Sequence, residues 1–415
     1  MKESMSITSS TYASALLTLP WDTPLEHWPD ELIAALPRGI SRHIVRFVGV
    51  ERGIVAVKEI GVRTAHHEYK MLRELQRLGA PSVRPVAVIT GRHPADEDYG
   101  ELTAALVTEH LEFSLPYREI FSRQLTTVEA EKLIRALSVL LVRMHLLSFY
   151  WGDVSLSNTL FRRDAETYSA YLVDAETGEF QPNLSESRRL YDLDIARVNI
   201  IGELMDLQAG DCLDADIDAI ALGSLVESSY LELWEELTAE ESVDANEYWK
   251  VSERIDRLNQ LGFEVGELKV TKDDSKHTVR IRPVVVDPGH YRAQLLSLTG
   301  LSVEEHQAQR LLSSIQAYQA VECSPHVGLT QAAHRWMTHE YEPTIAAIPD
   351  DMLGKLEPAQ VFHEITDHRW FLSQDRGEAV SLPEATESYL ATVLPSRRDE
   401  ARLLRTVSRS SDAEL

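Results

Sequence analysis

The stretch that decides the fold is YWGDVSLSN at residues 150–158, in which Asp153 and Asn158 stand on either side of small and aliphatic residues. An apolar stripe at helical spacing precedes it and starts at Thr126 with a capping box, which predicts a long helix. A short strand follows the stretch, and a second, aliphatic strand then ends at Asp174. We therefore expect a helix, a polar loop and a short hairpin with a carboxylate at its end.

The residues before this stretch predict a region rich in strands. Alternating hydrophobic residues indicate strands over 43–50 and 54–60, joined by a short turn into a hairpin. A helix capped by Thr64 should follow, because apolar residues recur there at helical spacing. Further strands are expected over 83–89 and 102–108. Strands thus precede helices along the chain.

The polar loop and the end of the hairpin carry residues suited to phosphoryl transfer. Asp153 and Asn158 match the D-x-x-x-x-N of kinase catalytic loops, where the aspartate deprotonates the acceptor hydroxyl and the asparagine binds a magnesium ion. Asp174 supplies the carboxylate that such a reaction needs, because the metal bridging the phosphates takes hard oxygen ligands. Glu176 is a candidate second ligand.

The second expected strand carries a candidate for nucleotide binding. Val55-Ala56-Val57-Lys58 matches the V-A-I-K strand of kinases, in which the lysine reaches the phosphates. Ala56 faces the same side as the lysine and is expected to lie against adenine. Glu68 on the next helix should pair with Lys58, and Glu74 is the alternative partner.

The strand over 102–108 leads into Glu109-His110-Leu111, where Glu109 and Leu111 are further candidates for nucleotide contact. Lys, Glu, Asp, Asn and Asp thus occur in the order that a kinase requires. The sequence therefore predicts an α+β, bilobal protein-kinase-like fold with a β-rich N-lobe and a helical C-lobe, using ATP and Mg²⁺.

Composition limits the possible partners and surroundings. The 415 residues include 66 acidic and 41 basic side chains, and the net charge of −25 should repel nucleic acid and anionic lipid. The two cysteines form no disulfide or zinc pattern. The longest apolar stretch is too short to span a bilayer, so we expect a cytoplasmic protein.

The expected boundaries follow changes in pattern along the chain. The C-terminal part should be mostly helical and contain a β-hairpin around Lys272 to Lys276. We expect a loose leader at 1–25, an N-lobe at 26–112, a C-lobe at 113–237, a C-terminal domain at 238–395 and a flexible tail at 396–415.

Four long strings carry a family resemblance: LPRGISRHIVRF, LEFSLPYREIF, YWGDVSLSNTLFRRD and YLVDAETGE. They resemble an uncharacterised actinobacterial family whose N-terminal half is similar to lipopolysaccharide (Kdo/WaaP-type) kinases and whose C-terminal half is a domain of unknown function. The resemblance covers about residues 20–390. Together with the kinase pattern, we expect a phosphotransferase for a hydroxyl acceptor, such as a sugar or a lipid-linked compound, and the C-terminal domain is a candidate site for a protein partner.

Several residues depart from the kinase pattern. Trp151 stands where kinases carry histidine, Ala175 and Glu176 replace the Phe-Gly of D-F-G, and Ser155 replaces the catalytic-loop lysine of protein kinases. Only Gly39 is available for a nucleotide loop. These departures keep open the alternative of a catalytically inactive nucleotide-binding module. A scaffold in which the acidic C-terminal helices recruit a protein partner is a further alternative.

Two further patterns have more than one interpretation. Asp192 and Asp194 resemble the Asp-Ile-Ala of aminoglycoside kinases, where the aspartate braces the catalytic loop, but they also fit acids in the first turn of a helix. His363 and Asp367 fit a metal-binding pair, although His368 is off the face that a shared zinc site needs.

Overall fold

The computed structural model describes residues 4–9, 11–34, 43–50, 53–121, 125–214, 216–239, 241–244, 253–254, 258, 263–272, 278–324 and 326–401. These residues fall into two compact units. Unit 1 takes its described residues from 1–162, 170–229 and 401–415, and unit 2 takes them from 163–169 and 230–400. Among the described residues, no helix has the length and the apolar character needed to cross a membrane.

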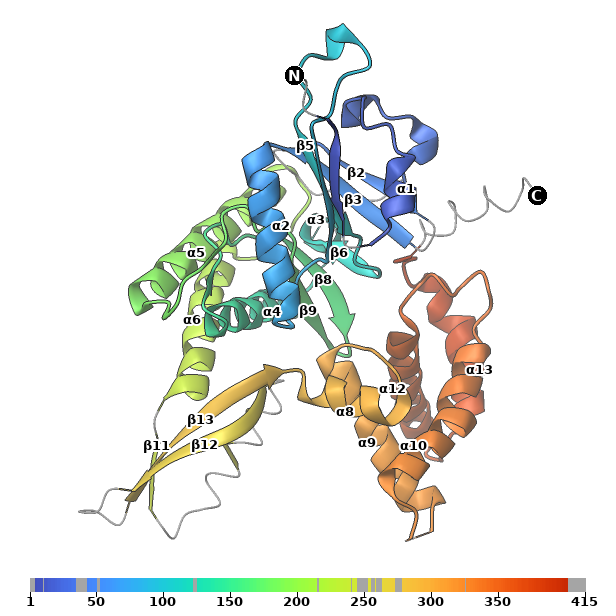
Figure 1. Ribbon diagram of the computed structural model, residues 1–415. Coiled ribbons are helices and arrows are strands. Elements are labelled where there is room, and N and C mark those ends of the chain that lie inside the picture. Colours follow the sequence, from blue (N-terminus) through green and yellow to red (C-terminus); the bar gives the residue numbers. More distant parts are fainter. Residues whose placement is uncertain are drawn as a thin grey trace. The chain divides into compact units, whose positions relative to one another are not determined.

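Unit 1 contains a five-stranded antiparallel sheet in the order β1-β4-β5-β3-β2 (Figure 1). Its strands are β1 (Ser6–Ser9), β2 (Val45–Val50), β3 (Gly53–Ile60), β4 (Pro85–Thr90) and β5 (Ala104–Glu109). Strands β2, β3, β4 and β5 occur where the sequence predicts strands. One sheet thus collects the expected strands and one that was not expected.

That unexpected strand corrects the expectation of a loose leader at 1–25. β1 pairs with β4, and helix α1 (Ala13–Leu17) follows it. Leu16, Trp21 and Leu25 are buried in one cluster with residues of the sheet. These side chains cover sheet surface that would otherwise be exposed, and this burial orders the segment.

Helices α2 (Val62–Arg77) and α4 (Thr127–Leu146) occur where the sequence predicts them. α2 packs on β4 and β5 (Figure 1). It begins directly after Gly61 and has no side-chain cap, so the expected cap at Thr64 is wrong. The capping box of α4 is confirmed, because the Thr126 hydroxyl accepts from the Glu129 backbone N–H at 3.2 Å.

The rest of unit 1 surrounds the polar loop. Two small sheets have the orders β6-β8-β9 and β10-β7. The remaining elements are 3-10 turns at Leu25–His27, Asp30–Leu32 and Glu97–Tyr99, β6 (Ser114–Pro116), α3 (Tyr117–Phe121), β7 (Phe149–Tyr150), β8 (Thr159–Asp164), β9 (Thr167–Leu172), β10 (Glu179–Phe180) and α5 (Glu186–Ala209). Residues 163–169, at the tip of the β8–β9 hairpin, are counted with unit 2.

Unit 2 is mostly helical and contains a β-hairpin, as expected. Its sheet has the order β11-β13-β12 (Figure 1), and its helices bury two apolar clusters. After α6 (Ala219–Thr238) come β11 (Glu241–Asp244), β12 (Phe263–Lys272), β13 (Thr278–Pro288), α8 (His290–Thr299), α9 (Glu305–Glu322), α10 (Leu329–Trp336), the π-helix η4 (Met337–Tyr341), α11 (Glu342–Ala346), α12 (Pro358–Arg376), α13 (Leu382–Thr392) and a 3-10 turn at Leu394–Ser396. The predicted fold class is confirmed.

The expected flexible tail at 396–415 is only partly among the described residues, which end at 401. Within unit 2, the carboxylate of Glu400 accepts from the guanidinium of Arg163 at 2.8 Å, and its side chain is only 2% exposed. The described beginning of this segment is therefore anchored by an ion pair between the buried Glu400 carboxylate and the partly exposed Arg163 guanidinium.

Candidate active site

Lys58 is at the centre of a charged cluster in unit 1. Strand β3 holds it opposite Leu106 of β5 and Val45 of β2. Its ammonium donates to the carboxylate of Glu68 at 3.0 Å and to that of Asp174 at 2.6 Å. Glu176 lies 3.9 Å away. The structure thus brings together four of the residues selected from the sequence.

The orientation of helix α2 makes Glu68, rather than Glu74, the partner of Lys58. Glu68 lies on the buried face of α2 and is only 1% exposed. The alternative, Glu74, instead makes two hydrogen bonds with Arg77 on an exposed part of the helix. His67 donates to the Gly178 carbonyl at 2.8 Å, so α2 is also tied to the segment that follows Asp174.

The cluster holds more negative than positive charge. Burial raises the pKa of Glu68 to about 7, and the nearby Asp174 adds to this effect against the opposing pull of Lys58. Burial lowers the pKa of Lys58, but Glu68 and Asp174 outweigh it, so this pKa is raised above its ordinary value. One ammonium therefore faces several carboxylates, and the cluster favours a further cation.

The polar loop holds Asp153 and Asn158 together. The Asn158 amide donates to the backbone carbonyl of Asp153 at 2.9 Å and to its carboxylate at 3.1 Å. The Val173 backbone N–H donates to the Asn158 carbonyl at 3.0 Å. Because Asp174 is the next residue, this bond places the end of the β8–β9 hairpin beside the loop.

Asp192 braces the loop from helix α5. Its carboxylate accepts from the backbone N–H groups of Trp151 and Gly152, both at 2.8 Å, and from His145 at 3.1 Å. It is fully buried, and it lies well past the first turn of a helix that starts at Glu186. The first-turn interpretation is therefore wrong for Asp192. Asp194 instead pairs with a neighbouring arginine on an exposed face.

Trp151 and Gly152 show how the loop is built without the usual histidine. The Trp151 indole is fully buried and donates to the Asp174 carbonyl at 2.9 Å. Gly152 has a φ of +79°, and a β-carbon there would lie 3.2 Å from the Thr177 carbonyl oxygen. The indole thus links the loop directly to the residue at the end of the hairpin, and the glycine permits the close approach.

Sequence reasoning missed two side chains of α5 that hold the loop. The Asn199 amide donates to the Asp153 carboxylate at 3.3 Å and to the Val154 carbonyl at 3.0 Å. The Glu203 carboxylate accepts from two successive backbone N–H groups of the loop, at 2.8 and 2.9 Å. Asp192, Asn199 and Glu203 recur at helical spacing, and this periodicity of polar residues was the available signal.

The other candidates for nucleotide contact lie on β3, at the end of β5 and just after β5. Ala56 lies on β3 between Phe47 of β2 and Thr108 of β5. Glu109 is opposite Val55 at the end of the strand pair, and its carboxylate lies 3.4 Å from Arg84. Leu111 follows the end of β5. Gly39, the candidate for the nucleotide loop, is outside the described residues.

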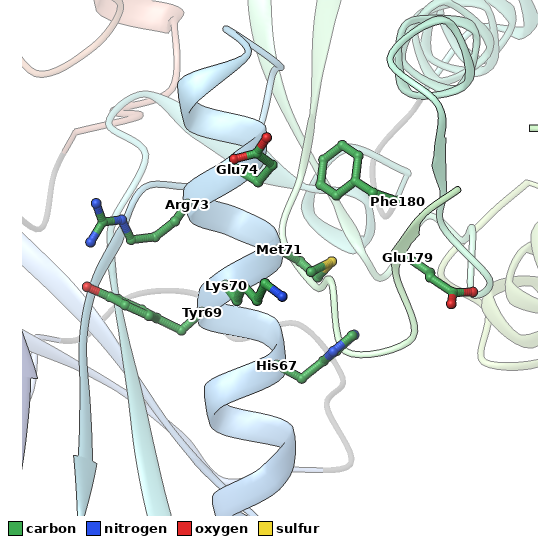
Figure 2. Close-up of a pocket in the computed structure, with 8 residues that line it drawn as sticks. All are labelled: His67, Tyr69, Lys70, Met71, Arg73, Glu74, Glu179 and Phe180. Carbon is green, nitrogen blue, oxygen red and sulfur yellow. The ribbon is translucent and has the colours of Figure 1, made fainter. Parts of the chain in front are cut away.

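A pocket of about 760 Å³ lies between α2 and β10 (Figure 2). It is lined by α2 side chains that include His67, Lys70 and Arg73, and by Glu179 and Phe180 of β10. Lys58, Glu68 and Asp174 are not among the residues that line it. This pocket is therefore separate from the charged cluster.

Comparison with known proteins gives matches to both halves of the chain. The model of the lipopolysaccharide kinase (Kdo/WaaP) family matches residues 48–198, and that of DUF4032, a domain of unknown function, matches residues 232–394. A search of curated proteins finds no match. A solved structure described as WaaP in complex with acyl carrier protein matches with a TM-score of 0.36 and 16% identity, over 62% of this chain and 99% of that one. The chain therefore joins a domain of the lipopolysaccharide kinase (Kdo/WaaP) family, at residues 48–198, to a DUF4032 domain at residues 232–394.

Proposed function

We propose that the protein is an ATP- and Mg²⁺-dependent phosphotransferase that acts on a hydroxyl acceptor, such as a sugar or a lipid-linked compound. The observation that carries the proposal is the contact of Lys58 with both Glu68 and Asp174, at 3.0 and 2.6 Å. A kinase site needs a lysine for the phosphates, a glutamate that orients it and an aspartate for the metal. The family of residues 48–198 supports the same class of reaction.

Asp153 acts as the base in this proposal. Two amides, from Asn158 and Asn199, donate to its carboxylate at 3.1 and 3.3 Å. These bonds fix the orientation of the carboxylate relative to the loop, so that it can accept a proton from the acceptor hydroxyl. Glu203 and Asp192 are positioning residues, because they accept hydrogen bonds from the backbone of the loop and so hold Asp153 in place.

The residues present fit a magnesium ion. Asp174, Asn158 and Glu176 offer oxygen atoms, which are the ligands that Mg²⁺ prefers. Three carboxylates, those of Glu68, Asp174 and Glu176, lie within 3.9 Å of the single Lys58 ammonium, which favours the binding of a further cation. When bound, Mg²⁺ neutralises charge on the phosphates. Lys58 would then serve the phosphates, with Glu68 holding its ammonium, and Ala56, Glu109 and Leu111 would contact the nucleoside.

The proposal is tested by incubating the protein with ATP labelled at the γ-phosphate and a total metabolite and lipid extract. Labelled product is expected with wild type and with Asp194→Asn, an exposed control on α5. Asp153→Asn should lower the rate by about 10³-fold, because the variant loses the base and its single amide oxygen can accept from only one of the two asparagine amides. Equal labelling by wild type and Asp153→Asn would contradict the role of Asp153. Nucleotide-dependent stabilisation without transfer to any acceptor would favour an inactive nucleotide-binding module.

A further inference from the structure

Unit 2 contains a second group of metal-ligating side chains, apart from the phosphotransfer residues. Glu166 lies in the turn of the β8–β9 hairpin, and His363 and Asp367 lie one turn apart on α12. One ligand atom from each of the three lies within 4.8 Å of the others. The sequence identified the pair on α12, and the structure adds a third ligand from a distant segment.

The distances between the ligand atoms suit one shared ion. The His363 Nε2 atom is 3.3 Å from an oxygen of Asp367 and 4.0 Å from one of Glu166. Two ligand atoms that each lie about 2.0–2.2 Å from an ion are at most about 4.4 Å apart. A small rotation of the two carboxylates, which are 52% and 44% exposed, completes the triangle.

The imidazole is the fixed member of the group. His363 is only 5% exposed, so packing limits its rotation, whereas Glu166 and Asp367 face solvent. A buried imidazole with two accessible carboxylates gives an ion a route of entry and leaves room for water as a further ligand. Nitrogen together with oxygen ligands favours transition metals such as zinc over magnesium or calcium.

The turn that carries Glu166 is anchored to the same helix face. Gln360, one turn before His363 on α12, donates to the Ala165 carbonyl at 3.2 Å. Asp164 is buried and accepts from a backbone N–H at the start of α9 at 2.8 Å. Both residues that precede Glu166 are thus held in place, and Glu166 is presented to His363 by a rigid support.

Arg310 supplies the competing charge. Its guanidinium, on α9, makes an ion pair with Glu166. A divalent ion on Glu166 would repel this guanidinium, because like charges at short range disfavour each other. Arg310 therefore weakens binding of a cation, and its removal should strengthen it.

We propose that Glu166, His363 and Asp367 bind a divalent transition-metal ion, with Zn²⁺ as the best match to the ligand set. The ion would join the hairpin turn to α12 within unit 2. The inference does not depend on the proposed phosphotransfer.

The test is calorimetric titration of the full chain with ZnCl₂, in an Asp174→Asn background that removes a carboxylate of the other proposed metal site. Saturable binding of one ion is expected. Asp367→Asn and His363→Gln should each lower the affinity by about tenfold or more. Arg310→Gln should raise it several-fold. His368→Gln is the matched control, because His368 is on the same helix but its ring is bonded to Ser388 at 2.9 Å.

Two results would overturn the proposal. One is the absence of saturable binding by the otherwise intact chain. The other is equal affinity in Asp367→Asn and His368→Gln, which would show adventitious binding by other side chains. Asp367 is 44% exposed, so its substitution should leave the fold intact, and the comparison holds even if His363→Gln unfolds the protein.

Discussion

Two buried carboxylates, Glu68 in unit 1 and Asp164 in unit 2, have opposite electrostatic states. Each is 1% exposed. Burial raises the pKa of Glu68 to about 7, with a further contribution from Asp174. Burial also acts to raise the pKa of Asp164, but hydrogen bonds from His306 and the start of α9 outweigh it and hold this pKa below its ordinary value. Burial alone therefore does not decide the charge of an acid.

The difference lies in the neighbours. Asp164 accepts from Ser169 at 3.0 Å and from His306 and the Gln307 backbone at 2.8 Å, so its charge is balanced by donors. Glu68 shares the ammonium of Lys58 with another carboxylate. A buried acid whose charge is balanced by hydrogen-bond donors stabilises the fold. A cluster in which two carboxylates share one ammonium is suited to binding a charged ligand.

The largest expected effect comes from removing the balanced acid. Asp164→Ala removes the acceptor of the Gln307 backbone N–H, of the Ser169 hydroxyl and of the partly exposed His306 imidazole, and should cost about 3–5 kcal/mol of unfolding free energy. Urea denaturation of wild type and variant measures this. The matched control is Asp194→Ala, whose exposed pair with Arg197 should contribute less than about 1 kcal/mol. Similar losses of unfolding free energy in the two variants would contradict the structural role of the buried Asp164.

A smaller effect is expected from neutralising the unbalanced acid. Glu68→Gln removes the repulsion between the Glu68 and Asp174 carboxylates, but it replaces the ion pair that orients Lys58 with a weaker hydrogen bond. The rate of the proposed phosphoryl transfer should therefore fall by about 10²-fold, which corresponds to about 2.7 kcal/mol in the barrier. Stability should change little or rise. Glu74→Gln, on the exposed part of the same helix, is the control and should leave the rate unchanged.

The smallest effect is the pH dependence of stability, which should have opposite signs for the two acids. Glu68 has a folded pKa of about 7, above its ordinary value, so its contribution is full below pH 4.5 and is lost as pH rises towards 7. The contribution of Asp164 is present above pH 3.8 and is lost as pH falls through its depressed pKa. Denaturation of Glu68→Gln between pH 4.5 and 8 should show a less negative slope than that of wild type. An unchanged slope would contradict the assignment.

Much of the fold could be predicted because its signals are local. The strand that carries Lys58, the capping box at Thr126 and the hairpin that ends at Asp174 all follow from residue spacing. The strand at residues 6–9 was missed, because its polar sequence SITS has no hydrophobic alternation and its order comes from pairing with β4. Tertiary contacts there override a weak local pattern.

In the candidate site, too, some residues could be predicted from the sequence and others could not. Spacing and chain order predicted that Lys58 pairs with a glutamate of the next helix, but not that it also contacts Asp174, and the choice between Glu68 and Glu74 needed the orientation of α2. Asn199 and Glu203 were missed because their partners, loop backbone groups and the Asp153 carboxylate, lie some 45 residues earlier in the chain. The spacing of polar residues on a helix shows that they share one face, but it does not show which other residues that face contacts.

The most direct test of the central claim is the binding of ATP with and without Mg²⁺, measured as a shift in melting temperature for wild type and Asp174→Asn. We expect Mg²⁺-dependent stabilisation of wild type by ATP and its loss in the variant, with the melting temperatures of the nucleotide-free proteins close together. Equal, Mg²⁺-independent shifts in the two proteins would contradict the account of Asp174 as the metal-binding carboxylate.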